Sequence, residues 1–212
     1  MKLASYRANY SKYENGSKAG QYINLDFAYL KELSTIDMHL RYLIIQMCLD
    51  IEHALKVSLI SHVERNPKED GYELIRRFIG YTNSKGQQQN EYILKKIRNH
   101  RSSDYSKDLI EKYYPYFPVW VFVELISFGD LTYLIAFYDK LYSDSIVNNK
   151  FMNIVRDLRN ASAHSNCLIN KLFEPLNPGQ QIDCIISNYI KNVPHISPAA
   201  RAKNLNYRIV YN

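Results

Sequence analysis

A long apolar repeat in the first third of the chain limits its possible folds more than any other feature of the sequence. From Phe27 to Leu59, apolar side chains return at steps of three and four residues, the spacing of one face of an α-helix. The repeat predicts one long amphipathic helix, or two nearly collinear ones, from Leu25 to about Val63. Asn66 and Pro67 predict its end. Few glycines accompany this pattern, seven in all, so we expect an all-α fold built on a long helix.

Shorter helices are expected after the long one. The apolar segment from Val119 to Phe128 fits a buried strand or a buried helix by periodicity alone, and its helical surroundings favour the helix. Gly129 is expected to end this segment and Asp130 to begin the next helix. The predicted helices are Tyr72–Tyr81, a helix capped by Asp104 that ends near Tyr114, Val119–Phe128 and Leu131–Tyr142.

The length of the chain, 212 residues, suits one domain with flanking segments. We expect an N-terminal arm over residues 1–24, a helical domain over 25–172 and a C-terminal extension over 173–212, whose end is a tail laid on the surface. A net charge of +6 and a pI near 9.0 favour an anionic partner, most commonly nucleic acid, although a purely solubilising charge explains them equally well.

The three cysteines are far apart and have neither zinc-site nor disulfide-framework spacing, so no metal or other cofactor is expected. The sequence contains no apolar run of transmembrane length and no signal-peptide pattern. We therefore expect a cytoplasmic protein without a membrane partner. Phosphate-binding, dinucleotide-binding, zinc-protease and nucleophile-elbow motifs are also absent from the sequence.

The segment from Phe151 to Lys171 carries the chemically most suggestive residues, Arg159, Asn160 and His164. Its apolar spacing predicts a helix capped by Ser145 or Asn148. Along that helix, one ridge is expected to hold Arg156, Asn160, His164 and Cys167.

Arg159 and His164 are five residues apart. At roughly 100° per residue they point about 140° away from each other on a regular helix. One helix therefore does not bring the two groups together, whereas two copies packed side by side can. This geometry favours a composite site at a dimer interface.

These residue types suit cleavage of RNA without a metal ion. A base must remove the proton of the 2′-hydroxyl and an acid must protonate the leaving 5′-oxygen, and histidine can do both. A guanidinium stabilises the charge on the phosphate, and Asn160 is placed to orient the His164 imidazole. The spacing alone is weak, because helices carry Arg and His in this way by chance. A capping or surface histidine is the alternative.

Three stretches together resemble the Abi family of bacterial abortive-infection proteins, of the AbiD and AbiF type. They are L-D-F-A-Y-L-K-E-L-S-T-I-D-M-H-L-R-Y-L-I-I-Q-M-C-L-D-I-E-H-A-L-K from Leu25, P-V-W-V-F-V-E-L-I-S-F-G-D-L-T-Y-L from Pro118 and L-R-N-A-S-A-H from Leu158. Their order also matches, over roughly residues 20 to 172. Ser165 stands where many relatives have a second histidine. Relatives usually have a longer N-terminal region, so we expect either a shortened member or a truncated start here.

The resemblance extends to the HEPN superfamily, helical domains that dimerise and cleave RNA through an R-x4-6-H motif. It implies a HEPN-like helical bundle that acts as an endoribonuclease toxin in phage defence, restrained in some members by a structured RNA. Arg159 matches the motif arginine, Asn160 the polar residue after it, and His164 the histidine.

A basic cluster near residue 100 is the expected RNA-guiding surface, although a solvated helix end explains it too. Its candidate contacts, with one from the motif helix, are Lys95, Lys96, Arg98, Arg101 and Arg156, and Arg201, Lys203 and Arg208 follow in the tail. Two further function classes remain open. One is an RNA-binding module without cleavage, and the other is a structural protein whose Arg159 and His164 hold a dimer together.

Overall fold

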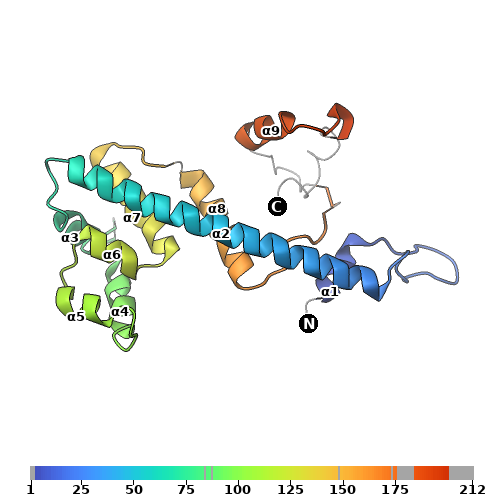
Figure 1. Ribbon diagram of the computed structural model, residues 1–212, viewed down its shortest axis with the longest axis horizontal. Coiled ribbons are helices and arrows are strands. Elements are labelled where there is room, and N and C mark those ends of the chain that lie inside the picture. The colour runs from blue at the N-terminus through green and yellow to red at the C-terminus, as the bar shows by residue number, and fades with distance from the viewer. Residues whose placement is uncertain are drawn as a thin grey trace. The chain divides into compact units, whose positions relative to one another are not determined.

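The computed structural model describes residues 3–83, 85–86, 88–147, 149–172, 174–175 and 184–200. Within them the chain forms helices joined by turns and loops (Figure 1), with isolated bridges between Lys12 and Tyr22 and between Thr82 and Gln88. The expected all-α fold is therefore confirmed. The helices are α1 (Leu3–Tyr6), η1 (Arg7–Asn9), α2 (Phe27–Arg65), α3 (Glu73–Ile79), α4 (Glu91–Asn99), α5 (Lys107–Tyr113), α6 (Val119–Leu125), α7 (Phe128–Tyr142), α8 (Asn149–Ala163) and α9 (Cys184–Lys191).

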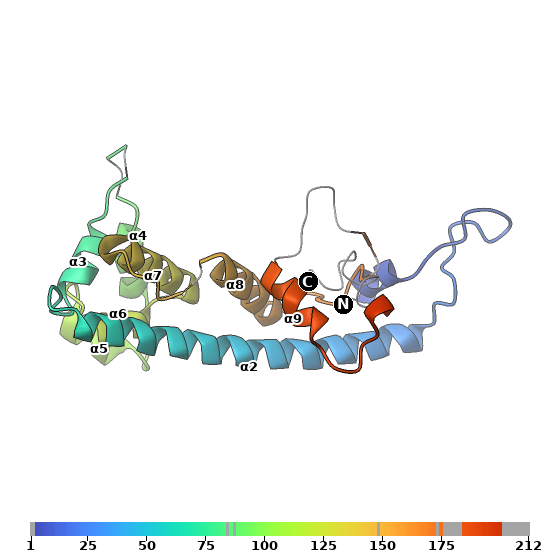
Figure 2. The same ribbon diagram turned by 90° about the horizontal axis from the view of Figure 1, so that it is seen from above.

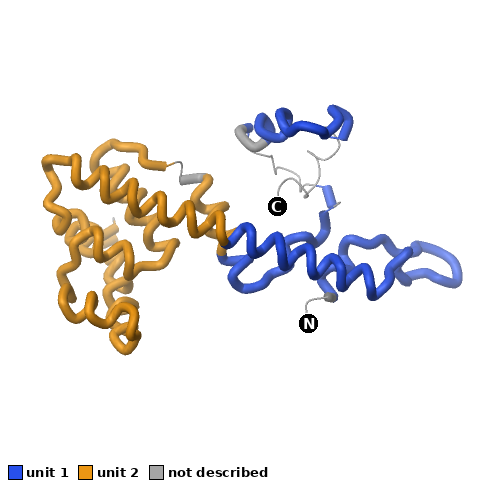
Figure 3. The backbone as a smooth tube through the Cα atoms, viewed as in Figure 1, with its two compact units in different colours: residues 1–45, 160–212 blue, residues 46–159 orange. Residues whose placement is uncertain are grey.

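The chain divides into two compact units, and the division does not follow chain order (Figure 3). Unit 1 contains residues 1–45 and 160–212, and unit 2 contains residues 46–159. Unit 1 therefore combines the first part of α2 with the segment that follows Arg159.

The long predicted helix is confirmed as the single helix α2. Its buried positions Leu30, Asp37, Cys48, Leu55, Leu59 and Val63 lie 7, 11, 7, 4 and 4 residues apart, which are sums of the three- and four-residue steps of the sequence repeat. The helix ends one residue before Asn66, as predicted from the proline that follows.

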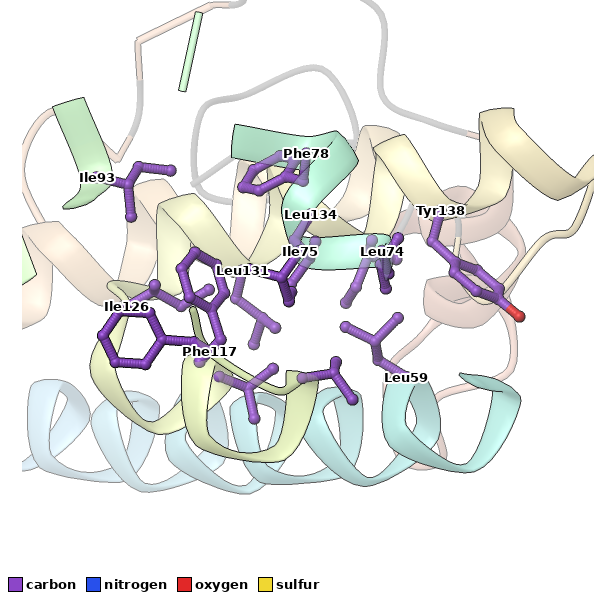
Figure 4. Close-up of a cluster of buried hydrophobic side chains, with 14 of the residues drawn as sticks. Leu59, Leu74, Ile75, Phe78, Ile93, Phe117, Ile126, Leu131, Leu134 and Tyr138 are labelled. Carbon is purple, nitrogen blue, oxygen red and sulfur yellow. The ribbon is translucent and has the colours of Figure 1, made fainter. Parts of the chain in front are cut away.

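The core of unit 2 forms where α3, α4, α5, α6 and α7 gather around the C-terminal half of α2 (Figure 2). In Figure 4, side chains from α2, α3 and α7 point toward one another. Burial of this apolar set is the main favourable term for folding the unit, at about 25 cal/mol per Å². Its most deeply buried members include Leu59, Leu74, Phe78, Ile93, Ile97, Ile110, Phe122, Leu131 and Leu134.

A buried tyrosine ties the end of α2 to α7. The Tyr138 hydroxyl donates to the His62 carbonyl oxygen at 3.1 Å and accepts from Asn66 Nδ2 at 3.2 Å. Its ring packs edge-on against His62 and is tilted against Tyr142. Because the hydroxyl is satisfied, the large ring can be buried without a polar penalty.

The predicted boundary between α6 and α7 is wrong by a few residues. α6 ends at Leu125 and α7 begins at Phe128, so Gly129 lies inside the first turn of α7. The cap is Ser127, whose Oγ accepts the Asp130 backbone N–H at 3.2 Å and donates to Asp130 Oδ2 at 2.6 Å. This reciprocal capping starts the helix ahead of the glycine.

Two other predicted caps do not hold. α5 begins at Lys107 after Ser106, so Asp104 is not its cap. α8 begins at Asn149, which is too far from Ser145 for that residue to cap it. The alternative cap, Asn148, lies outside the described residues, as do Arg201, Lys203, Arg208 and the rest of the tail predicted over residues 201–212.

Gly71 is the glycine whose replacement should disturb the fold most clearly. Its φ is +83°, and a Cβ atom there would lie 2.5 Å from Trp120 Cζ3. Its carbonyl oxygen also accepts the Val119 N–H at 2.8 Å, which connects the turn to α6. We expect Gly71→Ala to lower the free energy of unfolding by about 1–2 kcal/mol, because alanine is strained at positive φ. Urea unfolding would measure this loss. Gly86 also has a positive φ, but a Cβ atom there would meet nothing within 4 Å, so Gly86→Ala shows the effect of backbone strain without a steric clash.

No helix among the described residues combines the length and the apolar character needed to cross a lipid bilayer.

Candidate functional site

The end of α8 carries the motif residues. Arg159 and Asn160 lie in the last turn of the helix, and His164 follows its final residue, Ala163. Arg159 is half-buried, whereas Asn160 and His164 are exposed. The His164 backbone N–H still donates to the Asn160 carbonyl oxygen at 3.0 Å, as in a continuing helix.

The chain leaves α8 through a Schellman turn centred on position 165. The Asn166 N–H donates to the Ala161 carbonyl oxygen at 2.8 Å, and the Ser165 N–H donates to the Ser162 carbonyl oxygen at 3.0 Å. Ser165 has the left-handed φ of 53° that this motif requires. His164 is therefore the C-cap residue. Hydrogen bonds of the helix before it and of the turn after it hold its backbone in place.

The predicted ridge of four residues on α8 is wrong at its last member. The helix stops before Cys167, so this residue does not continue the line of Arg156, Asn160 and His164. Cys167 is half-buried, and burial, followed by the negative charge of Asp37, raises the pKa of its thiol. A thiol with a raised pKa is a poor nucleophile.

A buried carboxylate in α2 holds the segment that follows His164. Asp37 has no exposed surface, and its Oδ1 accepts the backbone N–H groups of Leu168 at 2.9 Å and Ile169 at 3.1 Å. Its Oδ2 accepts the Tyr6 hydroxyl at 2.7 Å and a short ion-paired hydrogen bond from Arg41 Nη1. Four donors thus converge on one side chain, which satisfies a buried charge that would otherwise be costly.

The N-terminal segment adds a second clamp on the same loop. Asn9 Nδ2 donates to the Ile169 carbonyl oxygen at 2.7 Å, and Asn9 Oδ1 accepts the Leu172 N–H at 3.0 Å. Burial and the hydrogen bond to Asp37 raise the pKa of Tyr6 to about 12, so its hydroxyl stays a proton donor at neutral pH. The loop after the motif is therefore pinned by side chains from η1, α1 and α2.

In the sequence alone, Asp37 and Arg41 are only polar positions on a long predicted helix. A signal was nevertheless present, because Asp37 falls on the apolar stripe of Leu30, Leu33 and Ile44 at steps of three, four and seven residues. An acid on a buried stripe needs partners. The identity of those partners, Leu168 and Ile169 among them, is not visible in that spacing.

The environment of Arg159 includes a buried thiol of α2. Burial raises the pKa of Cys48, and the nearby positive charge of Arg159 opposes the rise. The Cys48 Sγ contacts the Val155 carbonyl oxygen at 3.8 Å, which places α8 against α2 within unit 2.

The five cations predicted to contact RNA differ in how they are held. Lys96 lies 3.5 Å from the buried carboxylate of Asp130 and 4.6 Å from the centre of the Tyr92 ring. The Tyr92 hydroxyl donates to the same carboxylate at 2.7 Å. Burial, with this hydrogen bond second, raises the pKa of Tyr92. Lys96 therefore pairs with a carboxylate at the start of α7 and is also exposed at the surface.

Arg156 reaches the same helix start from α8. Its Cδ would lie 3.6 Å from a Cβ atom at Gly129, and its guanidinium contacts Asp157 Oδ1 at 3.1 Å. The structure thus brings Lys96 and Arg156 to the first turn of α7, although they are far apart in sequence.

Arg101 lies over the ring of Tyr114, 4.5 Å from its centre. Lys95 and Arg98, both exposed on α4, form no ion pair with a carboxylate in the described part of the chain. Among the described residues, these two exposed side chains have neither the carboxylate contact of Lys96 nor the ring contact of Arg101. Among the described residues, no three His, Cys, Asp or Glu side chains are grouped to hold a metal ion.

The comparison with protein families finds one match, to the model described as Abi-like protein, which covers residues 1–170. No curated protein and no solved structure matches the chain. The matched range includes the buried Asp37, its partners and the whole of α8 with the residues that follow it. The chain therefore belongs to the Abi-like protein family.

Proposed function

We propose that this protein is a metal-independent endoribonuclease of an abortive-infection system, with Arg159, Asn160 and His164 as its catalytic residues. Membership of the Abi-like family supports the role in abortive infection. The observation that carries the enzymatic part is the exposed His164 at the C-cap of α8, whose following loop is clamped by the buried Asp37. A catalytic side chain needs an accessible position on a backbone that does not move.

The proposed reaction is an intramolecular transfer of the phosphodiester. The imidazole of one His164 removes the proton of the 2′-hydroxyl, whose oxygen attacks phosphorus as the bond to the 5′-oxygen breaks. The leaving 5′-oxygen then takes a proton from the same His164, which has become an imidazolium. Arg159 stabilises the charge on the phosphate oxygens, and Asn160 orients the imidazole. The products are a 2′,3′-cyclic phosphate and a 5′-hydroxyl, and the reaction needs no cofactor.

We propose a homodimer because one helix does not bring Arg159 and His164 of the same chain together. At roughly 100° per residue, five helical positions turn the two motif side chains about 140° apart. Packing two copies of α8 side by side would join the arginine of one chain to the histidine of the other.

The proposed guide for RNA is the exposed face of α4. Replacing Lys95 and Arg98 together by alanine is expected to weaken the binding of RNA of any nucleotide sequence. It should also reduce the slope of log K against log salt concentration by about 0.7 for each lost phosphate contact. Fluorescence anisotropy with a labelled single-stranded RNA at several salt concentrations measures this slope. Lys107→Ala on α5, which removes an exposed lysine outside the cluster, should leave it unchanged.

The direct test of the function uses wild-type protein and end-labelled total RNA in the presence of EDTA. Fragments with 2′,3′-cyclic phosphate and 5′-hydroxyl ends are expected, and an empty-vector preparation carried through the same purification should produce none. Cleavage that stops in EDTA, or fragments with 5′-phosphate ends, would contradict the proposed chemistry.

A second candidate is an RNA-binding module that binds a structured RNA without cleaving it. The exposed Lys95 and Arg98 favour it. A gel shift on the same samples separates the two candidates. Intact RNA that is shifted at physiological salt, at every protein concentration tested, would support the binding module in place of the nuclease.

A further inference from the structure

A pocket in unit 2 lies apart from the motif residues. It has a volume of about 570 Å³ and is lined by side chains of α3, α7 and the residues after α3. This volume is in the range of sites that hold a small molecule. The lining residues used below are Arg76, Arg77, Tyr81, Phe137 and Lys140.

One wall of the pocket is aromatic. The rings of Tyr81 and Phe137 lie 5.6 Å apart at an interplanar angle of 69°, and Phe137 also packs on the buried Phe78 at 5.5 Å. Phe137 is thus fixed from below by the core, and Tyr81 remains 38% exposed. The two rings are steeply inclined to each other, so a planar ring can stack on the face of only one of them, and the partly exposed Tyr81 is the candidate.

The rim of the pocket is cationic and held in place. Arg76 donates to both oxygens of Glu73, through Nε at 2.7 Å and Nη2 at 2.8 Å, and Arg77 Nε donates to Glu73 Oε1 at 2.6 Å. These hydrogen bonds lower the pKa of Glu73 to about 2, so the clamp persists at any physiological pH. Each guanidinium has five N–H donors, so several remain for an anion.

The three cations of this rim differ in their partners. Lys140 is exposed and forms no ion pair with a carboxylate of the described residues. Glu73 binds both arginines, and the carboxylates of Asp70 and Glu69 also act on Arg76 and Arg77 respectively. Lys140 is therefore the cation of this rim that is most readily offered to an anion such as a phosphate.

From this combination of a stacking surface and a preorganised cationic rim, we propose that the pocket binds one phosphorylated nucleotide unit. The base stacks on Tyr81 with its edge toward Phe137, and the phosphate contacts Arg77 and Lys140. The unit is either a free 5′-mononucleotide or the 5′-phosphorylated end of an RNA. This site goes beyond the proposed ribonuclease function and does not require it, since the motif residues do not take part.

Isothermal titration calorimetry of the full chain with the four 5′-mononucleotides, adenosine and inorganic phosphate tests the proposal. A 2′-O-methyl trinucleotide, with or without a 5′-phosphate, replaces RNA because it lacks the hydroxyl needed for cleavage. We expect saturable binding of at least one 5′-mononucleotide or of the 5′-phosphorylated trinucleotide. Tighter binding of the former indicates a free nucleotide, and tighter binding of the latter indicates an RNA end.

The variants assign the binding to this pocket. Lys140→Glu, a change at an exposed position, should weaken binding at least tenfold, and Lys140→Arg should restore most of it. Tyr81→Leu should weaken nucleotide binding more than phosphate binding. Lys68→Glu, the same charge change at another exposed lysine of unit 2, should bind within about twofold of wild type. The proposal is overturned if no phosphorylated ligand binds saturably, or if Lys140→Glu binds as wild type does.

Discussion

Replacing Asp37 by alanine is expected to lower the free energy of unfolding by about 3–5 kcal/mol, the range for removing one partner of a buried ion pair. The substitution leaves Arg41 without its carboxylate and the buried Tyr6 hydroxyl without its acceptor. It also leaves the backbone N–H groups of Leu168 and Ile169 without their acceptor. Each unsatisfied buried group adds to the loss. Urea unfolding followed by circular dichroism measures the change.

Two controls make this result specific. Asp50→Ala removes an exposed carboxylate from the same helix and should change stability by no more than about 0.5 kcal/mol. Asp37→Asn keeps an oxygen for the loop and should lose less than Asp37→Ala. If Asp37→Ala unfolded at the urea concentration of wild type, the carboxylate would not anchor the loop after His164.

Replacing His164 by alanine is expected to reduce RNA cleavage by about 10²–10⁴-fold, the usual contribution of a general acid or base. The residue is exposed at a helix end, so the variant should fold and bind RNA as wild type does. Initial rates of cleavage of a labelled RNA measure the effect. His53→Ala, which removes an exposed histidine of α2, is the matched control. Full activity of His164→Ala would remove this histidine from the mechanism.

Mixing two inactive variants tests whether the site is composite. A dimer of one His164→Ala chain and one Arg159→Ala chain has one complete site if each site takes its arginine and its histidine from different chains. Co-expressed or refolded mixtures should then regain a substantial fraction of activity. If each chain supplied both residues of its own site, the mixture would remain inactive.

The sequence was most informative where the decisive residues are neighbours. The repeat from Phe27 onward predicted α2 to within two residues, because a helical face is encoded by side chains three and four positions apart. The start of α7 was also encoded locally, since Ser127 and Asp130 have the spacing of a capping box. The predicted break between α6 and α7 was instead placed at Gly129, although one glycine costs a helix only about 1 kcal/mol.

The end of α8 shows the limit of periodicity. The apolar steps reach Ala161 or Ser162 and do not mark where the helix ends. Ser165 adopts a left-handed conformation that an ordinary L-residue seldom takes, and this removes Cys167 from the helix. Glycine at position 165 would have signalled the turn, whereas serine does not.

By itself, the sequence determined the helical class, the position of the long helix and the order of Arg159, Asn160 and His164 along one helix end. Only the tertiary structure decided that Asp37 meets Leu168 and Ile169, which are 131 and 132 residues away. It also decided that Lys96 pairs with Asp130, whereas Lys95 and Arg98 remain exposed to a binding partner. The reason is that helical periodicity depends on neighbouring residues, whereas the partner of a buried charge depends on which distant backbone groups the fold leaves without hydrogen bonds.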